Sequence, residues 1–255
     1  MIHNEDCLST IHGMEDGSID LVFTSPPYFN ARPEYATYDD YHGYIEFMER
    51  VITGLHRVTA EGRYVVINTS PVLVPRKDRN DKSRRYNIPA HLNQIAEAAG
   101  FEFIDDIIWK KPFGAGCGRN KKFAQLRTPL YYHAEAITEY LMVYRTHTRH
   151  LPEWNVRKYD DEIVRSSAIT EYEPGNVWEF NPEQDSPHPA AFPPGLARRV
   201  ISLYSFRGDI VYDPFMGSGT TAVAAKSLGR RWVGSEIHPE YCRMAGERLA
   251  QEVLV

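Results

Sequence analysis

Two hydrophobic periodicities alternate along the chain. Short runs rich in β-branched and aromatic residues predict strands, and longer segments whose apolar residues return every three or four positions predict helices. Strands are expected at 18–25, 62–70, 101–111, 135–145, 209–215 and 230–237, and helices at 43–58, 88–100, 196–205, 219–229 and 239–253. Strands that alternate with helices are typical of a mostly parallel sheet covered by helices, so we expect an α/β fold.

No internal repeat or low-complexity tract divides this alternation, and we therefore expect a single domain over 1–255. Two stretches interrupt the pattern, at 71–87 and at 112–195, and the second of them contains the predicted strand 135–145. Insertions of this length in a compact domain are usually functional or mobile, so both stretches are candidates for a functional role.

The composition is that of an ordinary globular protein, with 42% hydrophobic and 25% charged residues, which suffices to bury a sizeable core. No apolar run approaches the ~20 residues that a membrane helix requires. The N-terminal segment MIHNEDCLST lacks the basic stretch and apolar stretch of a secretory signal. We therefore expect a cytoplasmic protein without a membrane partner.

The three cysteines, Cys7, Cys117 and Cys242, are widely spaced and form no CxxC pair. This arrangement fits reduced thiols better than a disulfide or zinc framework, so no metal site is expected. The net charge of -5 argues weakly against a nucleic acid as partner. However, 76–85 and 110–127 each contain six Lys or Arg residues, which suits contacts to phosphate groups. A solvated charged face is the alternative interpretation of each run.

The segment LVFTSPPYFN, at 21–30, begins as a buried strand and has to stop at Ser25. A proline cannot donate a hydrogen bond to a neighbouring strand, and here two prolines, Pro26 and Pro27, follow each other. The sequence therefore predicts a rigid corner rich in carbonyl groups, with a serine before it and Tyr28 after it.

A second motif, VYDPFMGSGTTAVAA at 211–225, is typical of a strand, a glycine turn and a helix. Gly217 and Gly219 allow a tight turn and a close approach of the backbone to a ligand, and the helix that starts at Thr220 offers free N–H groups. Glu236 ends the next strand, where an acid can accept hydrogen bonds from both ribose hydroxyls of a nucleoside. A tight turn without a ligand remains the alternative.

Two related nucleotide motifs fit less well. Ala222 stands where a dinucleotide-binding motif has its third glycine, which makes the dinucleotide interpretation less attractive. No Lys-Ser or Lys-Thr pair directly follows the last glycine of the motif, so a phosphate-binding P-loop is excluded.

Taken together, the motifs resemble those of amino-group DNA methyltransferases that use S-adenosylmethionine. TSPPY at 24–28 resembles the catalytic motif, DPFMGSGTT at 213–221 the cofactor motif, HPAAFP at 188–193 a third block, and NEDCL at 4–8 the N-terminal cofactor segment. The catalytic motif precedes the cofactor motif, as in the permuted β class. The resemblance implies a Rossmann-like class I methyltransferase fold with a mostly parallel seven-stranded sheet, a circularly permuted motif order and inserted target-recognition loops, expected within 112–187.

The resemblance implies a site-specific enzyme that transfers a methyl group from S-adenosylmethionine to N4 of a flipped cytosine in duplex DNA. The lone pair of an exocyclic amino nitrogen is delocalised into the base, and two hydrogen-bond acceptors can localise it. Oγ of Ser25 and the carbonyl of Pro26, held by Pro27, are the expected acceptors, and Tyr28 is expected to stack on the flipped base. The nitrogen then attacks the methyl group in line, helped by positioning and fixed dipoles.

The same resemblance implies a cofactor site built from both ends of the chain. Asp6 is expected to accept from the adenine amino group, the backbone at Cys7 to contact the ring, and Glu236 to hold the ribose. The other expected cofactor-binding residues are His188, Phe192, Asp213, Phe215, Gly217, Gly219 and Thr220. An ordinary surface carboxylate remains the alternative for Asp6, and a turn residue before a helix the alternative for His188.

The target base rests on Ser25, because serine before Pro-Pro usually accompanies N4 of cytosine in this family, whereas Asp or Asn more often accompanies N6 of adenine. Adenine N6 is the alternative target, and an RNA methyltransferase or a non-catalytic DNA-binding relative are further alternatives. A C5-cytosine methyltransferase needs a cysteine nucleophile after proline, which is absent here. A zinc base deaminase needs a PCxxC segment downstream of HAE at 133–135, which is also absent.

The basic runs are the expected contacts to double-stranded DNA. The candidate DNA-binding residues are Arg76, Lys77, Arg84, Arg85, Arg119, Lys121 and Lys122. A homodimer and a cognate restriction enzyme, as in a restriction-modification pair, are further candidate partners. No segment of the sequence identifies a DNA recognition sequence or a dimer interface.

Overall fold

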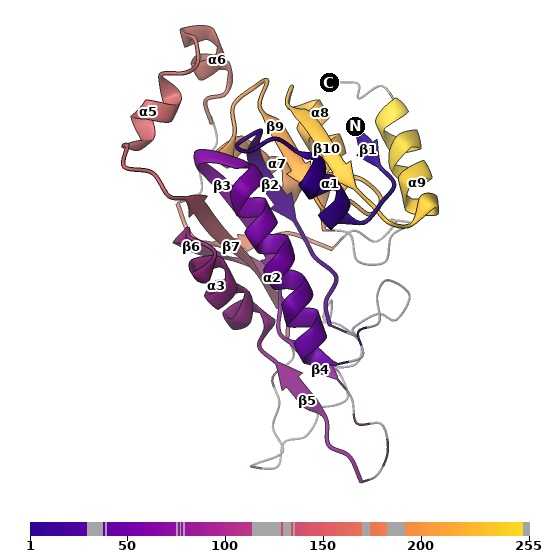
Figure 1. The fold of residues 1–255 in the computed structure, drawn as a ribbon. Coiled ribbons are helices and arrows are strands. Elements are labelled where there is room, and N and C mark those ends of the chain that lie inside the picture. Colours follow the sequence, from indigo (N-terminus) through magenta and orange to yellow (C-terminus); the bar gives the residue numbers. More distant parts are fainter. Residues whose placement is uncertain are drawn as a thin grey trace.

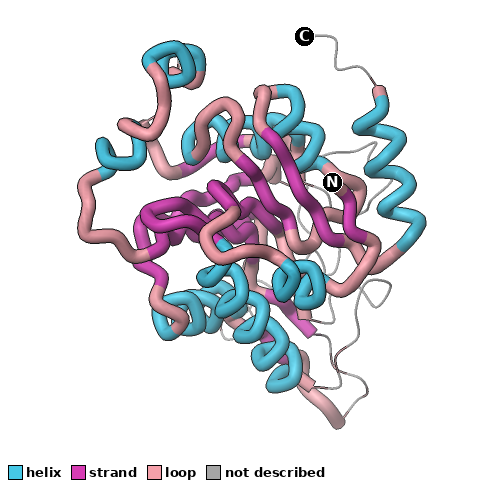
Figure 2. The backbone as a smooth tube through the Cα atoms, turned by 45° about the horizontal axis from the view of Figure 1, so that its top comes forward, coloured by secondary structure: helices cyan, strands magenta, loops and turns pink. Residues whose placement is uncertain are grey.

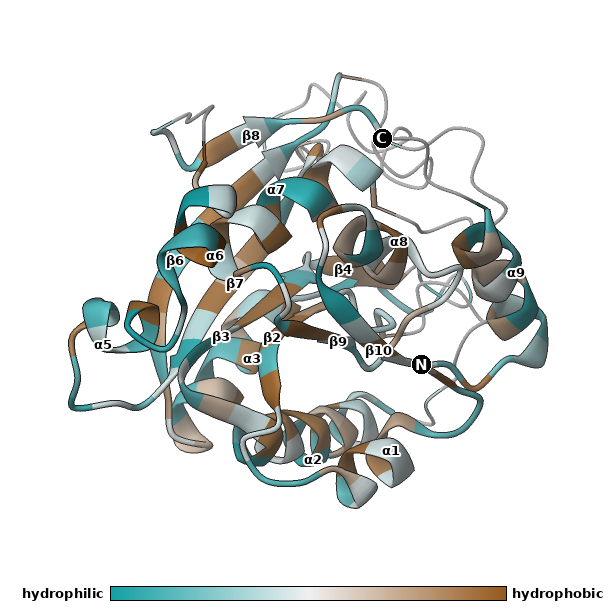
Figure 3. Cartoon of the chain, turned by 90° about the horizontal axis from the view of Figure 1, so that it is seen from above, coloured by the Kyte–Doolittle hydropathy of each residue, from teal (hydrophilic) through white to brown (hydrophobic). Residues whose placement is uncertain are grey.

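The computed structural model describes residues 1–29, 38, 40–74, 76, 78, 80–113, 129, 134, 136–169, 174–182 and 192–251. Its centre is a twisted sheet whose strands run side by side between layers of helices (Figure 2). Helices α1 (Cys7–Gly13), α2 (Tyr41–Val58) and α3 (Ile88–Ala98) cover one face, and α7 (Pro194–Tyr204), α8 (Thr220–Ser227) and α9 (Pro239–Ala250) cover the other (Figure 3). The predicted α/β class is confirmed.

The main sheet has the strand order β1-β10-β9-β2-β3-β7-β6-β8. The bounds of these strands are β1 (Ile2–His3), β2 (Ile19–Thr24), β3 (Thr59–Thr69), β6 (Phe101–Lys110), β7 (Thr138–Thr146), β8 (Val177–Glu179), β9 (Ile210–Asp213) and β10 (Arg231–Ser235). Within this sheet of described residues, β7 alone runs against the others, since it pairs antiparallel with both β3 and β6. The sheet therefore has eight described strands, one more than the seven expected.

The pairing of β2 with β9 places the two motifs beside each other. Leu21 pairs with Val211 and Val22 with Tyr212, in parallel. From this pair the chain winds outward in opposite directions, through β10 and β1 on one side and through β3 on the other. Such a switch point in a parallel sheet is where ligands bind, beyond the carboxyl ends of the strands.

Alternation along β2 explains the apolar run Leu21, Val22 and Phe23. Val22 belongs to the core cluster under α1 to α3, whereas Leu21 and Phe23 belong to the cluster under α7 and α8. Successive side chains of a strand point to opposite faces, and here both faces are covered by helices. Each of the three side chains is fully buried.

The predicted strands and helices are all present, with ends shifted by a few residues. The pattern did not reveal the smaller elements, which are too short to show a period: β1, α1, the hairpin strands β4 (Val72–Val74) and β5 (Arg84–Tyr86), α5 (Pro152–Val156), α6 (Asp161–Ser166) and β8. The β4–β5 hairpin extends away from the sheet beyond α2 (Figure 1). Among the described residues, no helix is both long and apolar enough to cross a bilayer.

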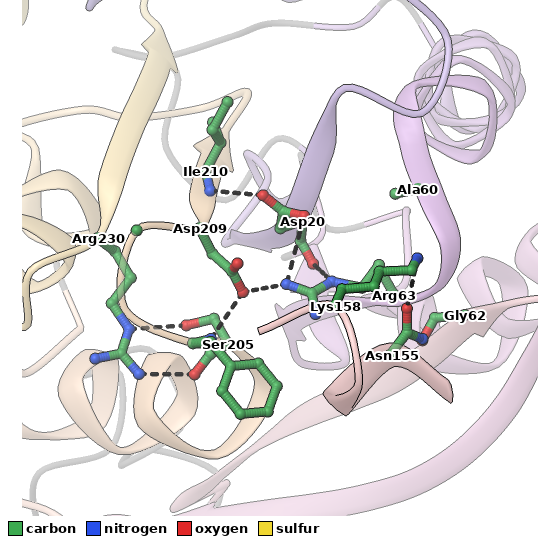
Figure 4. Close-up of polar contacts among 12 residues, drawn as sticks. Asp20, Ala60, Gly62, Arg63, Asn155, Lys158, Ser205, Asp209, Ile210 and Arg230 are labelled. Carbon is green, nitrogen blue, oxygen red and sulfur yellow. Dashed lines mark hydrogen bonds and ion pairs between the residues drawn. The ribbon is translucent and has the colours of Figure 1, made fainter. Parts of the chain in front are cut away.

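A buried polar cluster lies at the amino ends of the parallel strands, opposite the carboxyl ends that follow the two motifs (Figure 4). Arg63, only 5% exposed, forms an ion pair with Asp209 and donates from Nε to the carbonyl of Asp20 over 3.0 Å. The hydroxyl of Tyr159 donates to Oδ1 of Asp209 over 2.6 Å, and Asn155 donates to the carbonyl of Gly62 over 3.2 Å. These contacts fasten the segment that carries α5 and α6 to the sheet.

Candidate active site

The SPPY corner lies where β2 ends, at the carboxyl edge of the sheet. β2 stops at Thr24, as expected from the prolines, with Pro26 buried and Ser25, Pro27 and Tyr28 half-buried. From the neighbouring strand β3, Nδ2 of Asn68 donates a hydrogen bond to Oγ of Ser25 over 3.2 Å.

A carboxylate from the reversed strand lies beside this corner. The hydroxyl of Tyr28 donates to Oε2 of Glu139 over 2.8 Å, and Nδ2 of Asn68 donates to the same oxygen over 2.7 Å. The ammonium of Lys111 forms an ion pair with Oε1 of Glu139. Burial, and then the negative charge of Glu139, hold the pKa of Tyr28 well above its ordinary value, so its hydroxyl remains a hydrogen-bond donor.

The carboxylate of Asp213, at the end of β9, is enclosed by donors from the protein itself. Its Oδ1 accepts from the hydroxyl of Thr24 over 2.6 Å and from the backbone N–H of Phe215 over 3.0 Å. Its Oδ2 accepts from the hydroxyl of Thr221 over 2.7 Å. Burial raises the pKa of Asp213 to about 6, against the opposing effect of these hydrogen bonds. Asp213 thus links the catalytic corner to the glycine turn and the start of α8.

Glu236 directly follows β10, with one carboxylate oxygen toward the glycine turn and the other toward the start of α9. Oε2 accepts from the backbone N–H of Gly217 over 2.9 Å, and Oε1 accepts from the backbone N–H of His238 over 2.8 Å. A carboxylate oxygen can accept two hydrogen bonds, so each oxygen keeps a lone pair for a further donor. Two neighbouring hydroxyl groups of a ribose match this pair of acceptors.

The glycine turn is closely packed against its surroundings. Gly219 has a φ of 83°, and a Cβ atom there would lie 2.9 Å from Cβ of Ala245. A Cβ atom on Gly234 would overlap the sulfur atom of Met216 and lie 2.9 Å from its Cγ. Both positions therefore require glycine if the loop is to keep its place beside Glu236.

The N-terminal segment reaches the same edge because β1 pairs with β10. Nδ2 of Asn4 donates to the carbonyl of Glu236 over 2.9 Å. Oδ1 of Asp6 accepts from the backbone N–H of Leu8 over 2.8 Å and so caps α1. Burial, with the charge of Asp6, raises the pKa of the Cys7 thiol to about 12, which keeps it protonated.

A match to the sequence profile of a known protein family identifies the family of this chain. The sequence profile of the DNA methylase family matches residues 19–247. This family comprises N6 and N4 methyltransferases. The chain belongs to the DNA methylase family. The resemblance seen in the motifs is therefore confirmed at the level of an amino-group DNA methyltransferase, while the profile covers both target nitrogens.

Two similar proteins and two similar structures extend this assignment. The orphan methyltransferase M.BamHII of Bacillus amyloliquefaciens is 31% identical over 94% of this chain and 92% of its own length. The type II methyltransferase M.ScaI of Streptomyces caespitosus is 28% identical over 99% and 82%. A candidate DNA modification methylase from Thermus thermophilus superposes with a TM-score of 0.76, at 27% identity over 99% and 95%. The PvuII DNA methyltransferase, 19% identical with a TM-score of 0.74 over 100% and 87%, supports the fold alone.

Three of the expected cofactor residues of this methylase take part in packing. The ring of Phe192, 7% exposed, lies 4.8 Å from that of Phe23 under the sheet. The ring of Phe215 meets that of Phe47 on α2 edge to face at 6.1 Å. Thr220 is buried, and its Oγ1 accepts from Arg248 of α9 over 3.3 Å. His188 lies outside the described residues, and the cofactor contacts of all four remain predictions.

The expected DNA contacts of this methylase are described only in part. Arg84 and Arg85 lie exposed on β5, and Arg76 is exposed in the loop of the same hairpin. Tyr86 stacks on Tyr41 of α2 with ring centroids 4.2 Å apart, which fixes the hairpin to the domain. The remaining candidates, Lys77, Arg119, Lys121 and Lys122, lie outside the described residues.

Sequence reasoning missed three polar residues at the catalytic corner: Asn68, Glu139 and Lys111. Asn68 could have been suspected, because it ends an apolar strand next to the strand of Ser25. Glu139 is the second residue of β7, and it reaches the site only because β7 runs in reverse. The periodicity of an isolated strand does not reveal its direction in the sheet.

Proposed function

We propose that this member of the DNA methylase family transfers a methyl group from S-adenosylmethionine to the exocyclic N4 of a cytosine flipped out of duplex DNA, at a specific site. The observation that carries the proposal is the placement of two sites side by side. The SPPY corner and the glycine turn with Glu236 follow strands on both sides of one switch point, and the hydrogen bond from Thr24 to Asp213 joins them.

S-adenosylmethionine is the methyl donor, and the residues fit it. The two free acceptor positions on Glu236 suit the ribose hydroxyls, and Gly217 and Gly219, both at positive φ, carry no side chain that would block the approach of the methionine part. Asp6 would accept from the adenine amino group through its second oxygen, and Phe215 would pack on the ring. The related Thermus thermophilus protein has also been crystallised with S-adenosylmethionine. When bound, the cofactor supplies an electrophilic methyl group on a sulfonium centre.

The residues of the corner prepare the amino nitrogen of the base. Oγ of Ser25 and the carbonyl of Pro26 accept its two hydrogens, which localises the nitrogen lone pair. The ring of Tyr28, with its hydroxyl held by Glu139, offers a fixed surface for stacking on a base that has left its neighbours. No strong base is needed before transfer, because methylation leaves the nitrogen positively charged with two acidic protons, one of which is then lost to water.

Cytosine is the proposed target because serine stands before Pro-Pro. N6 of adenine is the alternative, since the amino groups of both bases present similar geometry and the family includes both activities. An RNA methyltransferase and a non-catalytic DNA-binding relative are further alternatives. They differ from the proposal in the nucleic acid modified or in the absence of any product.

Duplex DNA is the proposed partner, and the exposed arginines of the β4–β5 hairpin are proposed to contact its phosphates. The region 112–187 is proposed to choose the target sequence, and β7 and β8 are its described strands in the main sheet, where a single strand had been expected. A homodimer, a cognate restriction enzyme and a cytoplasmic location remain predictions.

The decisive experiment is to incubate the protein with unmethylated duplex DNA and S-adenosylmethionine, digest the DNA to nucleosides and identify the methylated one by mass spectrometry. N4-methylcytosine supports the proposal, and Ser25→Ala should then lower the rate at least about 100-fold. N6-methyladenine would keep the mechanism and replace the target base. Methylation of RNA alone, or no product with the cofactor bound, would overturn the proposal.

A further inference from the structure

Glu139 places a negative charge beside the catalytic corner. Its Oε2 accepts from Nδ2 of Asn68 over 2.7 Å, and the same Nδ2 donates to Oγ of Ser25 over 3.2 Å. Because the two hydrogen bonds share one nitrogen, Oε2 lies less than about 6 Å from Oγ of Ser25. The side chain of Glu139 is only 14% exposed, so solvent screens its charge little.

The ion pair between Glu139 and Lys111 turns its negative member toward the corner. Oε1 of Glu139 pairs with the ammonium of Lys111, whereas Oε2 accepts from Tyr28 and Asn68. The ammonium lies over the ring of Trp109, 4.5 Å from its centre. The carboxylate is therefore the charged group that is hydrogen-bonded to the side chains around Ser25.

The order of the strands sets the two carboxylates of the site on opposite sides of Ser25. β9, which precedes the glycine turn, and β10, which precedes Glu236, lie on one side of β2, whereas β3 and β7 lie on the other. Since β7 runs in reverse, its first residues lie where β2 and β3 end. The proposed site of the methyl donor and Glu236 are thus on one side of the corner, and Glu139 is on the other.

Methyl transfer moves a positive charge across this arrangement. The lone pair of the amino nitrogen forms the bond to the methyl carbon, and the electron pair of the broken carbon–sulfur bond stays on sulfur. The positive charge passes from sulfur to nitrogen, which then loses one of its two protons to water. A fixed negative group on the far side of the nitrogen attracts the charge more strongly as it arrives there.

We propose that the negative charge of Glu139 stabilises the positive charge that develops on the amino nitrogen of the target base during methyl transfer, and that the charge of Lys111 opposes this effect. The inference rests on the proposed function. The two expected acceptors, Oγ of Ser25 and the carbonyl of Pro26, are neutral dipoles, to which Glu139 adds a full charge. It acts through its electric field and does not have to touch the base.

The electric field at Ser25 can be measured without cofactor or DNA. In Ser25→Cys, the rate at which iodoacetamide alkylates the new thiol at about pH 7 reports its thiolate fraction, and mass spectrometry of the peptide separates it from the other cysteines. Adding Glu139→Gln should raise this rate about 3- to 30-fold, and adding Lys111→Met should lower it about twofold or more. With both changes added, the rate should lie between these two.

The single-turnover rate of methyl transfer to duplex DNA, at saturating cofactor and DNA, should follow the opposite order. Glu139→Gln is expected to lower it about 3- to 30-fold, Lys111→Met to keep or exceed the wild-type rate, and the double variant to lie between them. Glu102→Gln is the control for both measurements. Glu102 pairs with Arg145 on the same two strands, roughly 23 Å away along them, and its variant should change either rate less than about twofold.

Two results would overturn the inference, with the Tm of each variant showing that it is folded. One is a Lys111→Met variant that accelerates alkylation and slows methyl transfer as Glu139→Gln does, which would show that the pair maintains the shape of the corner. The other is a Glu139→Gln variant with both rates unchanged. If Glu139→Gln does not fold, the direction of the change in Lys111→Met decides alone. A wild-type protein without methyl transfer would refute the proposed function, while the alkylation rates would still show whether Glu139 makes the corner negative.

Discussion

The hydroxyl of Thr24 donates to Oδ1 of Asp213 over 2.6 Å, although 189 residues separate them in the chain. Thr24 is the residue before the SPPY corner, and Asp213 is the residue before the loop with the glycine turn. Both are buried. The hydrogen bond therefore holds the proposed site for the base and the site for the methyl donor in one fixed relation, which an in-line transfer requires.

Asp213 should make the stability of the protein depend on pH. Its pKa is about 6 in the folded chain, against 3.8 for an unperturbed Asp, so between these values the folded state binds more protons than the unfolded state. The contribution of Asp213 is greatest below pH 4 and is lost as the pH rises through 6, by about 2 to 3 kcal/mol. Urea unfolding from pH 4 to 7 measures it.

Asp213→Asn is the matching variant, because the amide oxygen can still accept from Thr24 and Phe215. The difference in unfolding free energy between wild type and this variant should shrink as the pH rises through the window. A difference that stays constant from pH 4 to 7 would contradict the raised pKa.

Glu236→Gln should weaken cofactor binding. A glutamine has one acceptor oxygen, so its amide NH₂ would face the backbone N–H of either Gly217 or His238, and two donors would meet there. It would also offer the ribose hydroxyls fewer acceptors. We expect the Kd for S-adenosylmethionine to rise about 10- to 100-fold by calorimetry. Glu240→Gln, on the exposed first turn of α9, makes the same charge change and should leave the Kd within about twofold. Equal effects of both variants would refute the role of Glu236.

Gly234→Ala should destabilise the loop beside the cofactor site. The added methyl group would overlap the side chain of Met216, which lies in the loop between β9 and α8. We expect a loss of about 1 to 3 kcal/mol in unfolding free energy, measured by urea titration. Gly13→Ala is the control: nothing lies within 4 Å of its Cβ position, and it should be neutral or slightly stabilising. Similar losses in both would show that packing against Met216 is not the cause.

Arg63→Met should be strongly destabilising, because it leaves the buried carboxylate of Asp209 without its guanidinium partner. The expected loss is about 3 to 5 kcal/mol in unfolding free energy. Arg243→Met, which breaks an exposed pair with Glu247, should cost less than about 1 kcal/mol. Adding Asp209→Asn to Arg63→Met should recover part of the loss. If the double variant had a lower unfolding free energy than Arg63→Met alone, the uncompensated charge of Asp209 would not be the cause of the loss.

Much of the site follows from local rules. Prolines after Thr24 end β2, glycines after Met216 permit a turn, and the acid Glu236 directly follows β10. Each of these effects depends on a residue and its immediate neighbours, so the sequence indicated the corner, the turn and the acid before any fold was known. The sequence pattern did not predict the smaller helices and strands, because two to seven residues are too few to display a period.

The amino-acid sequence by itself determined the α/β class, the strands that carry each motif and the residue types available at the corner and the turn. Only the tertiary structure decided that β2 pairs with β9, that β7 runs in reverse and that Glu139 therefore lies beside Ser25. The reason is physical. Side-chain periodicity and backbone preferences act within a few residues, whereas strand order and direction are chosen by which arrangement buries both faces of the whole sheet.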